Sequence, residues 1–327
     1  MTDSLHTTSD VTSETYTRLD MKSALQLMAP RSWVASIAPV VIGAALTFSQ
    51  KVIVSPFSIG HMLFASALML ITSIALQSAV NTFNDYADYV SGTDTAENIP
   101  DVTEGSIIFN RLDPADAKRL ALACLAVALV TGMVLVVMTG WKLLVLGLVG
   151  VATVLTYSLG PKPLSYLPIG EVISGVVMGG IITVGTTVAL SGHLDPRVFL
   201  YSLPLVIGIG VFMQSNNTCD IEKDIEAGRR TLPIAIGRNR SRTLLMILSL
   251  TALLIVALIG LYQFPLGLLA FAIMGLWHIR NLCALARNPF TLESRRDAMS
   301  RSVNQLKMLT VTYLLMIIIG TLIDVLR

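Results

Sequence analysis

One stretch of the sequence joins a long apolar run to a cluster of carboxylates: Asn84-Asp85-Tyr86-Ala87-Asp88-Tyr89-Val90-Ser91-Gly92-Thr93-Asp94. If the preceding helix continues, Asp85 and Asp88 share one of its faces, and Asn81 lies one turn earlier on that face. Gly92 allows the chain to turn and bring Asp94 back toward this pair. Because carboxylates this close repel one another, the stretch predicts that a cation lies among them.

The composition is that of an integral membrane protein. Of the 327 residues, 54% are hydrophobic and 13% are charged, and the mean hydropathy is +0.71. Soluble domains usually carry about 25% charged residues, so a soluble chain with a large core is excluded. Residues 1–20, rich in Ser, Thr and Asp, are expected to form a disordered cytoplasmic tail, and 21–327 the membrane domain. We expect no nucleic-acid partner.

Nine apolar segments are each long enough to cross a bilayer, which takes roughly 20 residues of helix. They lie at about 31–49, 59–84, 116–139, 141–160, 168–190, 197–217, 242–262, 264–286 and 305–326. With the N-terminus in the cytoplasm, the inner side carries 19 of the 23 Lys and Arg residues. This asymmetry predicts a multi-pass protein of the cell (inner or plasma) membrane whose N-terminus and carboxylate cluster face the cytoplasm.

A second carboxylate cluster follows the sixth segment, where Asn216 and Asn217 precede Asp220 and Asp224. The two Asp residues are four apart, so they share a helix face with Asn216 one turn earlier. Either cluster alone is compatible with a polar helix end in water. Their repetition at equivalent helix ends instead favours one shared site, formed by two pseudo-repeats of about 21–160 and 161–327.

The ligand types in the two clusters favour a hard cation. They offer oxygen atoms and no His or Cys, which selects Mg²⁺ before Ca²⁺. Magnesium usually takes one or two carboxylates together with substrate phosphates, so an acidic site of this kind is typical of diphosphate binding. Lys162, Arg229 and Arg230 are expected to neutralise the remaining charge. The alternative for each is a side chain that only reaches the membrane surface.

A third feature is the loop Tyr157-Ser158-Leu159-Gly160-Pro161-Lys162-Pro163-Leu164-Ser165-Tyr166-Leu167-Pro168-Ile169-Gly170-Glu171. Pro161 and Pro163 stiffen it. Glu171 begins the fifth segment near the inner interface, where a carboxylate is a candidate functional group. The alternative is an acid that only stabilises a helix N-terminus.

These residues together resemble a known family, the UbiA-type intramembrane prenyltransferases, and within it the 1,4-dihydroxy-2-naphthoate polyprenyltransferases of menaquinone synthesis. The family motif N-D-x-x-D-x-x-x-G-x-D is met by Asn84, Asp85, Asp88, Gly92 and Asp94. The second Asp motif is met by 216–232. The branch motif Y-x-x-G-P-x-P-x-x-Y-x-x-x-G-E is met by Tyr157, Gly160, Pro161, Pro163, Tyr166, Gly170 and Glu171. The chain departs from the branch at 101–104, which is acidic, and at Ala235, where Arg is usual.

The resemblance implies an all-α, polytopic membrane fold of nine transmembrane helices around a central cavity. It implies the transfer of a polyprenyl group from polyprenyl diphosphate to an aromatic acceptor, with Mg²⁺ or Mn²⁺ as cofactor. The implied catalytic groups are the four motif carboxylates, which with Asn84 also form the metal site: Asn84, Asp85, Asp88, Asp220 and Asp224. The implied diphosphate- and substrate-binding residues are Asn81, Asn84, Asp94, Tyr157, Lys162, Glu171, Asn216, Asn217, Arg229 and Arg230.

Three readings of the function are open from the sequence. The first is prenylation of 1,4-dihydroxy-2-naphthoate with loss of CO₂, which gives demethylmenaquinone. The second is the same chemistry on another aromatic acceptor, such as 4-hydroxybenzoate. The third is an ion-coupled transporter, against which the clusters speak because they lie at helix ends and not in broken helices at mid-membrane.

Overall fold

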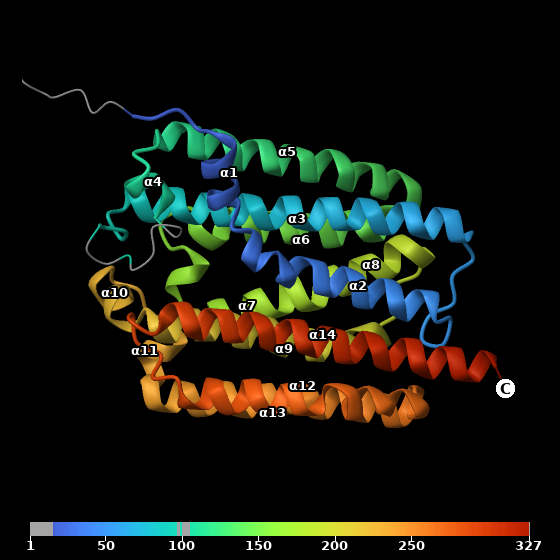
Figure 1. Cartoon of the computed structure of the whole chain (residues 1–327). Helices are drawn as coiled ribbons and strands as arrows, with labels where there is room; N and C mark the ends of the chain where they lie inside the picture. Colours follow the sequence, from blue (N-terminus) through green and yellow to red (C-terminus); the bar gives the residue numbers. More distant parts are fainter. Residues whose placement is uncertain (1–15, 97–98, 100–104, 327) are drawn as a thin grey trace, which may run out of the picture.

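The computed structural model describes residues 16–96, 99 and 105–326, and within that part of the chain it is almost entirely helical (Figure 1). The longer helices are α1 (Met21–Met28), α2 (Val34–Phe48), α3 (Ile59–Val90), α5 (Pro114–Thr139), α6 (Trp141–Ser158), α8 (Ile182–Ser191), α9 (Arg197–Cys219), α12 (Arg238–Gln263), α13 (Leu269–Arg287) and α14 (Arg295–Val325). The shorter ones are α4 (Ser106–Phe109), α7 (Gly170–Ser174), α10 (Ile221–Glu226), α11 (Leu232–Ile236), the 3-10 turns η1 (Pro30–Trp33), η2 (Leu164–Tyr166) and η4 (Pro265–Leu268), and the π-helical turn η3 (Gly175–Ile181).

Nine helices within the described residues are long and apolar enough to cross a membrane. This confirms the number predicted from the sequence. In lipid every backbone N–H and C=O must be satisfied within the chain, which is why the apolar runs become helices. The assignment of the N-terminus to the cytoplasm stays a prediction, and the acidic stretch 101–104 lies outside the described residues.

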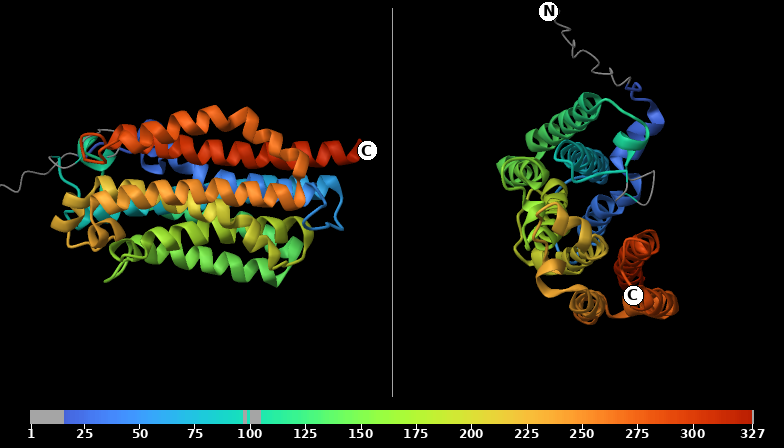
Figure 2. Two further views of the ribbon diagram at one scale, coloured as in Figure 1. Left: turned by 90° about the horizontal axis from the view of Figure 1, so that it is seen from below. Right: turned by 90° about the vertical axis from the view of Figure 1, so that its left-hand side faces the viewer.

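The long helices run side by side, and the short helices α4, α10 and α11 gather at one end of the bundle (Figures 1 and 2). Helix α2 lies between two clusters of buried apolar side chains. On one side Ala35 and Ile42 join residues of α9, α12 and α14, and on the other Val40 joins residues of α3, α6 and α8. The first half of the bundle is thereby packed against the second.

Two structural boundaries differ from the predicted ones in ways that matter for the site. Helix α3 continues to Val90, so Asp85 and Asp88 of the first motif lie on its last turns. Helix α14 begins at Arg295, ten residues before the predicted segment at 305–326. Its first turns are polar and carry no hydropathy signal, which explains why the prediction placed them in a loop.

The end of the predicted tail is attached to the bundle. The Thr17 backbone N–H donates to the Arg111 carbonyl at 2.8 Å. The Asp20 carboxylate then caps α1 by accepting from the Ser23 backbone N–H at 2.7 Å. The loop after α4 and the start of the membrane domain are thus held together by backbone and capping hydrogen bonds.

Gly175 and Gly179 let η3 pack directly on the backbone of α9. A Cβ added at Gly179 would lie 2.4 Å from the Val206 nitrogen, and one at Gly175 would lie 2.4 Å from the Val206 oxygen. Small residues four apart allow this kind of close helix contact in membranes, where packing rather than water drives association. The contact fixes the span that contains Glu171 against the helix that ends in the second carboxylate cluster.

We expect Gly179→Ala to lower the stability of the protein by about 1–3 kcal/mol, because the new methyl group overpacks a backbone contact. Gly275→Ala in α13 is the matched control, since no atom lies within 4 Å of an added Cβ there. That control should be neutral or stabilising by about 0.5–1 kcal/mol, the usual gain of Ala over Gly in a helix. Thermal unfolding in detergent measures both, and equal melting temperatures would contradict the close contact.

Candidate active site

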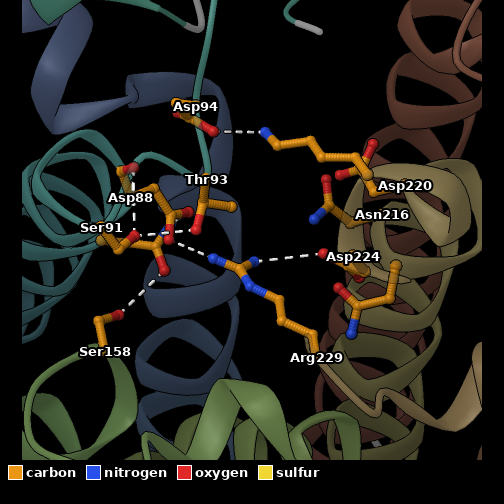
Figure 3. A network of polar contacts seen from close by, with 12 residues as sticks. Asp88, Ser91, Thr93, Asp94, Ser158, Asn216, Asp220, Asp224 and Arg229 are labelled. Atoms are coloured by element: carbon orange, nitrogen blue, oxygen red, sulfur yellow. Dashed lines mark hydrogen bonds and ion pairs between the residues drawn. The ribbon is translucent and has the colours of Figure 1, made fainter. Parts of the chain in front are cut away.

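The first carboxylate cluster is built on the last turns of α3. The Asn84 amide donates to Asp88 Oδ2 at 3.0 Å, and the Ser158 hydroxyl at the end of α6 donates to Asn84 Oδ1 at 2.9 Å (Figure 3). Gly92 adopts φ +72°, and the Asp94 backbone N–H then donates to the Asp88 carbonyl at 3.1 Å. The expected turn back toward the pair is confirmed.

The second cluster has the same turn. Gly228 also adopts φ +72°, and the Arg229 backbone N–H donates to the Asp224 carbonyl at 2.8 Å. Asp220 ends α9, and Asp224 lies on α10 one helical turn later. The two acidic helix ends are therefore locally equivalent, while the division of the whole chain into two repeats stays a prediction.

Cationic side chains of the chain itself lie among the carboxylates. The Arg229 guanidinium pairs with Asp88 of the first cluster and, at 3.4 Å, with Asp224 of the second (Figure 3). The Lys223 ammonium pairs with Asp94 at 2.5 Å. The Arg229 pair connects α3 to the turn after α10, and the Lys223 pair connects the turn after α3 to α10. The cation that the sequence required is thus supplied in this structure by Arg and Lys side chains.

Arg295, at the start of α14, is a site residue that the sequence reasoning missed. Its Nε donates to Asp220 at 2.8 Å, and its Nη2 donates to Asn216 Oδ1 at 2.6 Å. The one available signal was the basic pair Arg295-Arg296 shortly before the last apolar segment. It was counted only toward the membrane orientation, because the predicted helix began ten residues later.

Burial sets the protonation of the second cluster. It raises the pKa of Asp220 to about 7, although the charge of Lys223 opposes the shift. It raises the pKa of Asp224 to about 6, against the charges of Arg229 and Lys223. Buried carboxylates with raised pKa values are stabilised as anions when a further cation binds, and they are typical of functional sites.

A cavity of about 1510 Å³ begins at the two clusters and extends into the bundle. Its polar mouth includes Asp85, Asp88, Asp94 and Asp220. Its deeper wall is apolar and includes Met69, Leu143, Leu146, Ile182 and Phe212. Asp85 lines the mouth without a hydrogen bond or ion pair to any other described side chain. A charged end and a long apolar interior suit an amphiphilic ligand.

The structure places three other predicted site residues beside the cavity. Asn81 lines it, but its amide donates to the Met28 carbonyl at 3.0 Å and so holds the end of α1 against α3. Tyr157 lines it and accepts from the Ser174 hydroxyl at 3.3 Å. Asn217 also lines it and donates to Glu171 Oε1 at 2.8 Å.

Four predicted residues do not line the cavity: Lys162, Glu171, Arg230 and Asp224, which is buried on α10 and pairs with Arg229. Glu171 is buried behind Asn217, and its Oε2 has no hydrogen-bond partner among the described residues. Lys162 and Arg230 are exposed and do not line the cavity whose carboxylates they were expected to neutralise. Of the three basic residues proposed from the sequence, the structure brings only Arg229 between the clusters, because the Gly228 turn directs it back toward α3.

The donor set suits a hard divalent cation that brings ligands of its own. Within the described residues, no group of three or more His, Cys, Asp or Glu side chains is arranged to hold a metal by itself. The five predicted ligands are nevertheless all oxygen donors, and Asp224 Oδ2 is buried without a hydrogen-bond partner in that part of the chain. This fits Mg²⁺, which usually binds one or two carboxylates and completes its shell with phosphate oxygens and water.

An all-helical membrane bundle with paired Asn/Asp clusters above an apolar cavity defines a class of membrane-embedded enzymes that act on amphiphilic substrates. The sequence model of the UbiA prenyltransferase family matches residues 36–295, and the chain belongs to that family. It is therefore a prenyltransferase, and the family resemblance inferred from the motifs is confirmed.

Individual relatives support the same assignment. A 1,4-dihydroxy-2-naphthoate octaprenyltransferase of Bacillus subtilis is 34% identical over 67% of this chain and 68% of its own length. A UbiA prenyltransferase domain-containing protein 1 of Gallus gallus is 28% identical over 69% of this chain and 66% of its own. The chain thus spans about two thirds of the length of both. A UbiA homologue of Archaeoglobus fulgidus, solved bound to GPP and Mg²⁺, has the same fold with a TM-score of 0.62, 16% identity and coverage of 89% and 99% of the two chains.

We expect Arg295→Met to destabilise the protein by roughly 3–5 kcal/mol, the usual cost of leaving one partner of a buried ion pair uncompensated. The matched control is Arg301→Met on the same helix, where the lost partner Asp297 is half exposed. An exposed pair of this spacing contributes about 0.3–0.5 kcal/mol. Thermal unfolding of both variants in detergent is the measurement, and similar melting temperatures would contradict the role given to Arg295.

Proposed function

We propose that this chain transfers a polyprenyl group from polyprenyl diphosphate to 1,4-dihydroxy-2-naphthoate, with loss of CO₂ and diphosphate, to give demethylmenaquinol, the reduced form of demethylmenaquinone. The observation that carries the proposal is the meeting of two Asp clusters at the polar mouth of an apolar cavity. The Bacillus relative with this activity in its name, at 34% identity, supports the choice of acceptor.

The carboxylates of Asp85, Asp88, Asp220 and Asp224, with the amide oxygen of Asn84, would hold Mg²⁺. Bound Mg²⁺ supplies the positive charge that lets an acidic site hold a diphosphate and stabilises it as a leaving group. Mn²⁺ has the same preference for oxygen ligands and would substitute. Asp94, which pairs with Lys223, would hold that lysine at the edge of the diphosphate site.

The remaining steps follow from the protein side chains. Arg229, Lys223 and Arg295 would donate hydrogen bonds to the diphosphate oxygens as the allylic C–O bond breaks. The apolar wall would exclude water from the allylic cation and hold its tail. An electron-rich ring carbon of the acceptor then forms the new C–C bond. The acceptor carboxylate leaves as CO₂, so no external oxidant or reductant is required.

The loop from Tyr157 to Glu171 supports a place for the aromatic acceptor. Tyr157 and Ser174 both line the cavity, and the Tyr157 hydroxyl group accepts a hydrogen bond from Ser174 at 3.3 Å. Glu171 fixes Asn217 from behind by accepting its amide hydrogen bond. We propose that Tyr157 and Asn217 orient the acceptor, and that Glu171 positions Asn217. The Lys and Arg asymmetry of the loops supports a site facing the cytoplasm.

Purified protein should transfer a prenyl group only when Mg²⁺ or Mn²⁺ is present. Asp85→Asn and Asp220→Asn should each lower kcat by about 10²–10³, the usual loss when one electrostatic stabiliser of a transition state is removed. Glu222→Gln is the matched control, because Glu222 lies on α10 but is exposed and pairs with Arg238 outside the cavity. Full activity in either Asp variant, or activity in EDTA, would exclude the proposed metal site.

The acceptor is tested by competition. When equal amounts of dihydroxynaphthoate and 4-hydroxybenzoate are offered with polyprenyl diphosphate, we expect prenylated naphthoquinol as the product and one CO₂ released for each prenyl group transferred. Mass spectrometry of the product and ¹⁴CO₂ release from carboxyl-labelled acceptor measure both. If prenylated 4-hydroxybenzoate is the main product, the proposed acceptor is wrong, while the assignment as a prenyltransferase stands.

A further inference from the structure

Most of the carboxylates at the cavity mouth are paired with cationic side chains of the chain itself. Four carboxylates are paired with cationic side chains: Asp88 and Asp224 with Arg229, Asp94 with Lys223, and Asp220 with Arg295. Asp85 is the one carboxylate of the two motifs for which no pairing side chain is described. Four of the carboxylates near the expected divalent-cation site are thus already paired with singly charged Arg or Lys side chains.

Arg229 holds a special position among these cations. It contacts carboxylates of both motifs, and its side chain is only 12% exposed. Its backbone is fixed, because its N–H donates to the Asp224 carbonyl and Gly228 sets the preceding turn. The guanidinium group is therefore the part of Arg229 that is able to move. Its carbon lies 4.8 Å from the centre of the Tyr166 ring, which gives the cation a second supporting surface.

The pairing of Arg229 leaves several buried polar atoms unsatisfied. Arg229 Nε, Asp224 Oδ2 and, beside them, Glu171 Oε2 have no hydrogen-bond partner among the residues described. Unsatisfied buried groups are costly, and a purely structural ion-pair network normally satisfies them. The free donor on Arg229 and the free acceptor on Asp224 are those that a phosphate oxygen and a metal ion would use.

We infer that Arg229 is an exchangeable counter-cation: it neutralises Asp88 and Asp224 before substrate binds, and it turns to the diphosphate when Mg²⁺ takes over these two carboxylates. The inference rests on the proposed function. A metal ion bound to these two carboxylates would lie close to the guanidinium group that pairs with them. Because two cations repel each other strongly where water screens them poorly, the movable side chain is displaced as the metal binds. The planar guanidinium fork also matches two phosphate oxygens, which gives the displaced side chain a new partner.

This exchange predicts that one variant, Arg229→Met, binds the metal more tightly and the diphosphate more weakly. Arg229→Met removes the competitor, so Mn²⁺ alone should bind about tenfold more tightly, within the usual range of coupling between two ligands. The same variant lacks a phosphate partner, so inorganic pyrophosphate in the presence of Mn²⁺ should bind about tenfold more weakly or worse. Both affinities are measured on purified protein by Mn²⁺ EPR and by calorimetry, without any catalytic step.

Arg238→Met is the matched control. Arg238, at the start of α12, forms a two-pronged pair with Glu222 of α10, but it does not line the cavity. Both affinities should stay within about twofold of the wild type, as expected for a partly exposed pair. Arg229→Lys keeps one charge on a side chain that cannot bridge two carboxylates, so its Mn²⁺ affinity should lie between wild type and Arg229→Met.

The possible results separate the two proposals. If Arg229→Met weakens both affinities, or leaves Mn²⁺ affinity unchanged, Arg229 is a structural clamp or a simple phosphate ligand and the exchange is excluded. If Arg229→Met does not fold, Arg229→Lys serves as the test. A Mn²⁺ affinity equal to that of the wild type in Arg229→Lys would then exclude the exchange. If the wild type binds no Mn²⁺ with or without pyrophosphate, the proposed function itself fails.

Discussion

Repulsion between carboxylates at the edge of an apolar cavity is the constraint on which the rest of this structure depends. Water screens such charges poorly here, because the side chains of Asp88 and Asp224 are only 9% and 3% exposed. Each carboxylate cluster therefore needs cations within contact distance. The chain provides them from the turn after α10 and from the start of α14. The need for charge balance thus determines which loops lie over the mouth of the bundle.

This balance also links distant parts of the fold. Arg229 and Lys223 connect α10 to α3 and its following turn, and Arg295 connects α14 to the end of α9. Below them, apolar packing of α2 against both halves and the close contact of η3 with α9 set the spacing of the helices. The polar contacts lie at the helix ends and in the loops that follow them. A small change in side-chain position there alters the site without repacking the membrane core.

The sequence predicted the number of spans and the two carboxylate clusters because both depend on local composition and spacing. It misplaced the start of α14 because polar helical turns outside the bilayer look like loops in a hydropathy pattern. Arg295 was missed for the same reason. Lys162 and Arg230 were assigned to the site only because they lie near its motifs in sequence, and the direction of an exposed side chain is set by turn geometry that spacing alone does not give. Arg229 directly follows the Gly228 turn, and the structure places its guanidinium group between the two carboxylate clusters.

A UbiA homologue with 16% identity has the same fold, so this fold does not require one particular set of side chains. Apolar cores in general tolerate substitution as long as volume and packing are kept. The carboxylates and their cations are constrained more tightly, because an unpaired charge at low dielectric costs far more than an altered apolar contact. A site that binds a divalent cation and a diphosphate must also remain folded before either arrives. Internal cations satisfy that requirement: they neutralise the acids in the free protein and remain next to the position where the diphosphate charge enters. Under the exchange that we propose, the same side chains stabilise the free protein and then bind the substrate.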